Sequence, residues 1–129
     1  MATVDPAIAA AVAADRAELP HVRESVDTWV RGIGSRQIGL LRQVYPSMST
    51  QMRDGWNAMF TMSNDLSAQL VGTPVIVVHG STGDANFVIE MKGERSGSGN
   101  FTQRTSFRAH VQRTDHGWIF SSLDVSAGG

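Results

Sequence analysis

The side chain best suited to acid–base chemistry in this sequence is His79, which ends a run of strand-forming apolar residues. A histidine titrates near neutral pH, so inside a cavity it could act as a general base. Asp27, Tyr45 or Asp124 would then orient a substrate or stabilise charge beside it. No spacing in the sequence relates these three residues to His79, and a histidine in such a run more often has a structural or interface role. Catalysis through His79 is therefore the alternative hypothesis.

Aromatic residues at helical spacing could form the rigid walls of a ligand cavity. Tyr45 and Trp56 are the main candidates, and Trp29 is a third. All three lie on apolar helical stripes, so packing in the core is the competing role, and the pattern favours the core for Trp29. Several methionines could add an adaptable apolar lining or simply fill space. They include Met48, Met52, Met59 and Met62.

The sequence contains no pattern typical of metal or cofactor binding. It has no cysteine, which removes disulfides, thiolate metal sites and cysteine nucleophiles together. His21 and His116 have no third ligand at metal spacing. The Ser96–Gly99 run lies between two strand-forming runs, whereas a phosphate-binding loop leads from a strand into a helix. We therefore expect neither a metal nor a cofactor.

Basic residues on one strand-forming run could attract an anionic ligand or an acidic partner, or could simply face solvent. They are Arg104, Arg108, His110 and Arg113. The formal net charge of −1 favours a solvated face and argues against a nucleic-acid partner, since such proteins usually carry a basic surface. No apolar run approaches the roughly 20 residues of a membrane-spanning helix. The compartment stays open, and the extracytoplasmic part of a membrane-anchored bacterial protein is one of the assignments that fit.

Four runs rich in Val, Ile, Phe and Thr occupy residues 73–125, and this composition is typical of strands. Short breaks that contain Gly, Asp or Asn separate the runs, at Gly83-Asp84, Arg95–Asn100 and Thr114–Gly117. Such breaks are the usual signal of hairpins. The pattern predicts an antiparallel meander, entered through a short strand or extended connection at 65–71.

The alternation of side chains along each strand predicts the two faces of this sheet. If Gly83-Asp84 forms a two-residue turn, His79 opposes Val88. One face is then apolar and lies under the helices. It comprises Ile76, Val78, Phe87, Ile89, Met91, Phe101, Thr105, Phe107, Ala109 and Val111. The other face carries His79, Glu90 and Lys92, with Arg104 or Arg108 as ion-pair partners for Glu90.

The first half of the chain predicts helices that cover the apolar face. An Ala-rich lead-in begins with Asp5 as N-cap and Pro6 at the first helical position. Pro20 is expected to start a new helix. The three helices after the lead-in are expected at 20–33, 36–44 and 49–62. The predicted organisation is a helical lead-in or linker over 1–19, one domain over 20–126 and a tail over 127–129.

Two stretches carry a resemblance to a known superfamily: Leu40–Ser49, with Trp56 and Phe60 behind it, and Phe107–Leu123. With three helices ahead of an antiparallel meander, they resemble the nuclear-transport-factor-2-like, or SnoaL-like, superfamily. They are similar to domains at the C-terminal end of bacterial eukaryotic-like serine/threonine kinases. The resemblance implies an α+β, cystatin-like cone, with three N-terminal helices on a curved antiparallel sheet of four or five strands. Members include isomerases, hydrolases, dehydratases and cyclases as well as binding modules, so the fold does not choose the function.

The leading hypothesis is a non-enzymatic ligand-binding or dimerisation module, sensory in role, within a larger bacterial protein. Its ligand would be small and apolar, and the exposed sheet face would form a homodimer. The residues expected at the ligand are Tyr45, Trp56, His79, Phe107 and Asp124. The alternative is a small cofactor-free isomerase, dehydratase, cyclase or hydrolase, with His79 as the base and Asp27 or Asp124 beside it.

Overall fold

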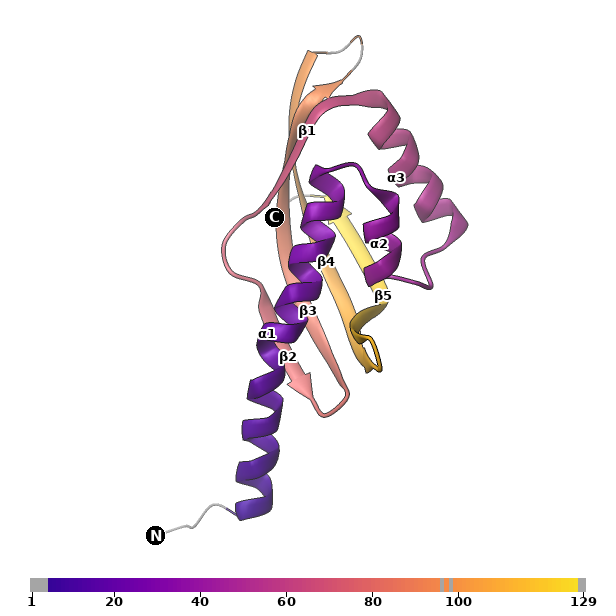
Figure 1. The fold of residues 1–129 in the computed structure, drawn as a ribbon. Coiled ribbons are helices and arrows are strands. Elements are labelled where there is room, and N and C mark those ends of the chain that lie inside the picture. Colours follow the sequence, from indigo (N-terminus) through magenta and orange to yellow (C-terminus); the bar gives the residue numbers. More distant parts are fainter. Residues whose placement is uncertain (1–4, 96, 98, 128–129) are drawn as a thin grey trace.

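The computed structural model of the chain describes residues 5–95, 97 and 99–127. Three helices precede five strands, and all the helices lie on one face of the sheet (Figure 1). The elements are α1 (Pro6–Gly34), α2 (Ile38–Val44), α3 (Thr50–Met62), β1 (Ser63–Leu70), β2 (Val75–His79), β3 (Thr82–Arg95), β4 (Gly99–Thr114) and β5 (Gly117–Ala127). The predicted α+β architecture of three helices on an antiparallel sheet is therefore confirmed. Residues 96 and 98 of the predicted Arg95–Asn100 turn, and 128–129 of the predicted tail, lie outside the described residues.

Helix α1 is continuous through Pro20, so the predicted restart of the helix at this residue is wrong. Its start is as expected, because the Asp5 side chain accepts a hydrogen bond of 2.8 Å from the Ala7 amide. A proline inside a helix removes one backbone hydrogen bond and costs about 3 kcal/mol. Burial of one large apolar side chain contributes about 1.5–3 kcal/mol, and the turns after Pro20 fully bury Val22, Val26 and Trp29. This burial offsets the cost and keeps the helix in one piece.

The end of the predicted lead-in is joined to the sheet by its side chains. Glu18 accepts hydrogen bonds from Trp118 Nε1 at 2.8 Å and from Arg113 at 3.2 Å. The Trp118 hydrogen bond is the main reason that the pKa of Glu18 lies below its usual value. Asp15 accepts from the Gly80 amide at 2.9 Å. The first turns of α1 extend past the sheet (Figure 1), and Ile8 is exposed there. The division of the chain at residue 19 stays a prediction.

The strands follow the order β1-β3-β4-β5, and β2 also pairs with β3. The turn between β2 and β3 lies at Gly80 and Ser81, so the predicted turn at Gly83-Asp84 is wrong, and His79 pairs with Thr82 rather than Val88. Gly80 has φ of +65° and so adopts the left-handed conformation that the turn needs. Gly83 lies within the hairpin, where its missing Cβ allows the backbone of β2 to come close.

The two faces of the sheet are those that the alternation predicts, despite the shifted turn. Residues on the inner face, which the helices cover, are buried; they include Ala85, Phe87, Ile89, Met91, Thr105, Phe107, Ala109 and Val111. On the outer face, Arg104 donates to Glu90 at 3.0 Å, which confirms the first of the two expected partners. This hydrogen bond is the largest cause of the lowered pKa of Glu90.

Candidate functional site

An apolar groove of about 460 Å³ lies between α3 and the end of β5. Figure 1 shows α3 standing away from the sheet over much of its length. The helix is capped at Ser49, whose side chain accepts from the Met52 amide at 3.1 Å, and Phe60 is its one buried residue. The groove is lined by Ser49, Gln51, Met52, Gly55, Trp56, Met59 and Val125. Because α3 leaves this part of the inner face uncovered, Val125 is 46% exposed although it pairs with the buried Phe107.

Trp56 connects the groove to an aromatic cluster that fills the space between the helices and the sheet. Its ring meets that of Trp29 edge-on, with centroids 6.0 Å apart, and stacks over Phe107 at 6.5 Å. Trp29 lies at the centre of the cluster, and its ring centroid is 5.4 Å from that of Phe120 and 6.5 Å from that of Tyr45. Trp29 is fully buried, which confirms the predicted core role. Edge-to-face and tilted ring contacts of this kind add about 0.5–1.5 kcal/mol each beyond area burial.

The indole nitrogen of Trp29 is buried without a hydrogen-bond partner among the residues that the structure describes. Trp118, by contrast, donates its indole N–H to Glu18. A buried donor without an acceptor costs about 1–3 kcal/mol. The cluster beside the groove therefore holds one unsatisfied donor in otherwise apolar surroundings.

The structure brings together three of the five residues predicted at the ligand, and it leaves two elsewhere. Tyr45, Trp56 and Phe107 surround Trp29. His79 is exposed at the end of β2, where it lines a separate hollow against the first half of α1. Asp124 is exposed on the outer face of the sheet.

The acids proposed for the catalytic alternative do not lie with His79. Asp27 is half-exposed on α1, where it forms an ion pair of 3.0 Å with Arg23. Asp124 lines a hollow on the outer face of the sheet, and Tyr45 packs on the inner aromatic cluster. The structure thus distributes His79, Asp27 and Asp124 over three different surfaces.

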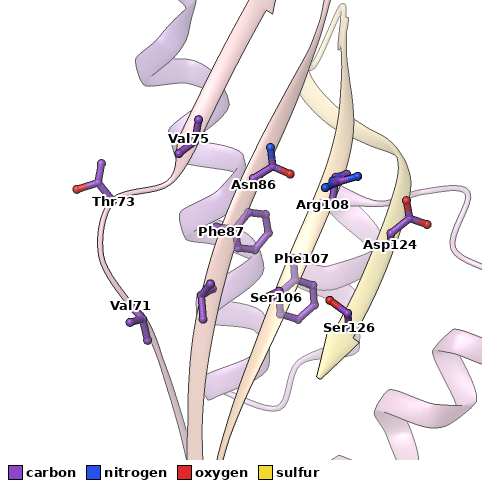
Figure 2. A pocket seen from close by; sticks show the side chains of 11 residues that line it. Val71, Thr73, Val75, Asn86, Phe87, Ser106, Phe107, Arg108, Asp124 and Ser126 are labelled. Atoms are coloured by element: carbon purple, nitrogen blue, oxygen red, sulfur yellow. The ribbon is translucent and has the colours of Figure 1, made fainter. Parts of the chain in front are cut away.

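A further hollow, of about 540 Å³, lies on the outer face of the sheet and is called the outer hollow below. Figure 2 shows Asn86, Arg108 and Asp124 on three neighbouring strands, and the pairing places them in one row across β3, β4 and β5. Val71, Thr73 and Val75 lie along one side of this hollow (Figure 2). Arg108 and Asp124 form no ion pair within 4 Å among the described residues, so the hollow presents two opposite charges side by side.

Sequence reasoning missed four residues that line the groove: Ser49, Gln51, Gly55 and Val125. The signal for Gly55 was a glycine inside an apolar helical stripe, where a gap against the neighbouring element is expected. Val125 shares the inner face with Leu123, two residues earlier, and this alternation could have placed it. Its exposure could not be found, because it depends on how far α3 stands from the sheet.

No protein-family model matches the chain, and no curated protein matches it. Solved structures do match it. A nuclear transport factor 2-like superfamily protein from Salmonella enterica superimposes with a TM-score of 0.73 at 16% identity, covering 85% of this chain and 90% of that one. A nuclear transport factor 2-like protein with a cystatin-like fold from Novosphingobium aromaticivorans has a TM-score of 0.69 at 15% identity, with coverage of 98% and 92%.

The chain has the nuclear transport factor 2-like, cystatin-like fold. The narrower resemblance to kinase C-terminal domains stays a prediction. The hexachlorocyclohexane dehydrochlorinase LinA-type3 from Novosphingobium barchaimii shares this fold, with a TM-score of 0.69, 14% identity and coverage of 89% and 90%. At this identity the likeness concerns the fold alone, and the nuclear transport factor 2-like fold supports both enzymes and binding proteins.

The described part of the chain shows neither a membrane-spanning helix nor a metal-binding cluster. None of its helices combines the length and apolar character that a membrane crossing requires. Within residues 5–95, 97 and 99–127, no cluster of three or more His, Asp or Glu side chains could hold a metal ion.

Proposed function

We propose that this chain is a non-enzymatic module that binds a small apolar ligand in the groove between α3 and β5. The observation that carries the proposal is the lining of the groove: it contains methionine, tryptophan, valine, glycine, serine and glutamine, and none of these is ionisable. Each Å² of apolar surface that a ligand and the groove remove from water contributes about 25 cal/mol of favourable free energy to binding. Methionine side chains adapt to ligands of different shape, so Met52 and Met59 suit a binding site better than a rigid catalytic site.

The catalytic alternative has weaker support. Acid–base catalysis needs a titratable group within hydrogen-bond reach of the reacting atom. His79 is exposed beside Val12 and Asp15 of α1, in a hollow separate from the apolar groove. Some proteins of this fold are enzymes, as the dehydrochlorinase illustrates. That activity is a property of the dehydrochlorinase, and the residues that line the apolar groove of this chain include no acid or base.

The substitution Gly55→Leu tests the proposal by filling the groove. A Cβ at Gly55 would meet no atom of another element within 4 Å, so we expect the helix to accept the leucine and its side chain to fill part of the groove. We expect wild-type protein to bind the neutral fluorescent probe N-phenyl-naphthylamine, and Gly55→Leu to weaken binding about tenfold, as lost apolar burial of about 1.4 kcal/mol implies. Fluorescence titration measures both affinities.

The matched control is Gly39→Leu. Gly39 is also helical, also exposed and also open within 4 Å, but it lies in α2 and away from the groove. We expect this variant to bind the probe as the wild type does. Equal affinities in all three proteins, or no binding to the wild type, would contradict the groove as a ligand site.

We also propose that the outer face of the sheet forms a homodimer. Its support is the self-complementary pair of charges in the outer hollow, because a two-fold axis can bring Arg108 of one copy against Asp124 of the other. We expect a dimer by sedimentation velocity and a monomer for Arg108→Asp, since two acids would then face each other. The double variant Arg108→Asp/Asp124→Arg restores the complementarity and should dimerise. A monomeric wild type would refute this arrangement.

A sensory role in a larger bacterial protein stays a prediction.

A further inference from the structure

The buried N–H of Trp29 is a donor for which the described residues supply no acceptor. Trp29 is fully buried, so the solvent does not satisfy this group directly. Indole nitrogen can donate a hydrogen bond but cannot accept one. Any group that satisfies Trp29 must therefore bring an acceptor into the aromatic cluster.

Trp56 is the ring that links Trp29 to the apolar groove. It lines the groove and also contacts Trp29 edge-on at 6.0 Å. Trp56 is only partly buried, and Phe60 is the one residue of α3 that is buried. A ligand in the groove can thus reach Trp29 if the Trp56 side chain changes rotamer or α3 shifts outward.

We infer that the ligand is an apolar molecule with one uncharged oxygen acceptor, such as a ketone, ester or ether, which accepts from Trp29 Nε1. This inference rests on the proposed function and specifies the chemical class of its ligand. An anionic acceptor is disfavoured, because the groove lining and the rings around Trp29 include no cation to compensate its desolvation. A pure hydrocarbon would fill the groove and leave the N–H unsatisfied. Trp29 is therefore a specificity-determining residue.

Acetophenone and ethylbenzene form a matched pair of probes, because they differ only in one carbonyl oxygen of the ketone, which replaces two hydrogens of the hydrocarbon. We expect the ratio of their affinities, ketone over hydrocarbon, to fall about tenfold when Trp29→Phe removes the donor, as a buried hydrogen bond of about 1.4 kcal/mol implies. Trp118→Phe is the control, because Trp118 donates to Glu18 away from the groove. This variant should keep the wild-type ratio.

A second measurement uses the wild-type protein alone and so does not depend on the folding of a variant. The chain has 3 tryptophans, so a nitrogen–proton correlation spectrum contains three indole signals. Through-space contacts from each indole proton to its neighbours in the wild-type protein assign them. We expect acetophenone to move the Trp29 indole proton downfield and ethylbenzene to leave it nearly unchanged.

The outcomes separate this inference from the proposed function. If both probes bind but the affinity ratio is the same in Trp29→Phe and the Trp29 indole signal does not respond to acetophenone, the inference is wrong and the groove remains a ligand site. If neither probe binds the wild type and the naphthylamine probe also fails, the proposed function is wrong, and this inference is overturned with it.

Discussion

Replacing Trp29 with alanine is expected to lower the free energy of unfolding by about 3–5 kcal/mol, the usual cost of removing a buried tryptophan. Trp29 is fully buried, and its ring is within 6.5 Å of the rings of Tyr45, Trp56, Phe107 and Phe120. The substitution leaves a cavity where α1, α2, α3 and the sheet meet, and rigid aromatic rings cannot collapse to fill it. Urea denaturation followed by circular dichroism measures the loss.

Trp56→Ala is the comparison for this result. Trp56 belongs to the same aromatic cluster, but it is only partly buried and borders the groove. Its truncation opens the groove to solvent instead of creating a closed cavity, so we expect a clearly smaller loss than for Trp29→Ala. If Trp56→Ala costs as much as Trp29→Ala, or if Trp29→Ala costs less than about 1 kcal/mol, Trp29 is not the centre of the packing.

The substitution Gly83→Ala is expected to destabilise the protein by about 1–3 kcal/mol or more, the usual range for overpacking. A Cβ at this position would overlap the carbonyl oxygen of Val77 and lie 3.2 Å from Val78 Cα and 3.3 Å from Val111 Cγ2. Two of these three atoms belong to the backbone of β2, so the overlap can be removed only if the strand itself moves. Thermal unfolding, with the melting temperature as readout, measures the effect.

The same substitution at a matched glycine is expected to raise the stability instead of lowering it. Gly39 lies in α2 with nothing within 4 Å of an added Cβ, so Gly39→Ala should stabilise by about 0.5–1 kcal/mol through the better helix propensity of alanine. We also expect Gly83→Ala to increase hydrogen exchange in β2 while leaving the β4–β5 pair protected. A neutral Gly83→Ala would mean that β2 approaches β3 less closely than the structure has it.

Gly83 and Gly80 illustrate what local sequence signals can and cannot predict. The Gly83-Asp84 dipeptide resembles a hairpin turn, but the turn forms at Gly80, where φ is +65°. Both positions carry a glycine for a sound reason, one for a turn and one for a close backbone approach. The choice between them depends on which register lets β2 reach α1, where Asp15 accepts from the Gly80 amide. That contact joins residues far apart in the chain.

Pro20 shows the same limit for helices. Its local effect is to interrupt a helix, and the sequence therefore predicted a boundary there. The structure continues α1 from Pro6 to Gly34, because the apolar stripe after Pro20 is anchored in the core and Glu18 before it is anchored to Trp118. The strength of these anchors is a property of the packed molecule.

The sequence by itself determined the elements and their faces. Apolar residues repeat every three to four positions in helices and every second position in strands, and this periodicity is local, so it placed Trp29 in the core and Phe107 on the inner face. The tertiary structure alone decided which side chains share a site. It placed Trp56 with Trp29 and left His79 and Asp124 on other surfaces. The physical reason is that the groove depends on the distance between α3 and the sheet, and the unpaired donor depends on which rings of different elements surround Trp29. No local pattern encodes either.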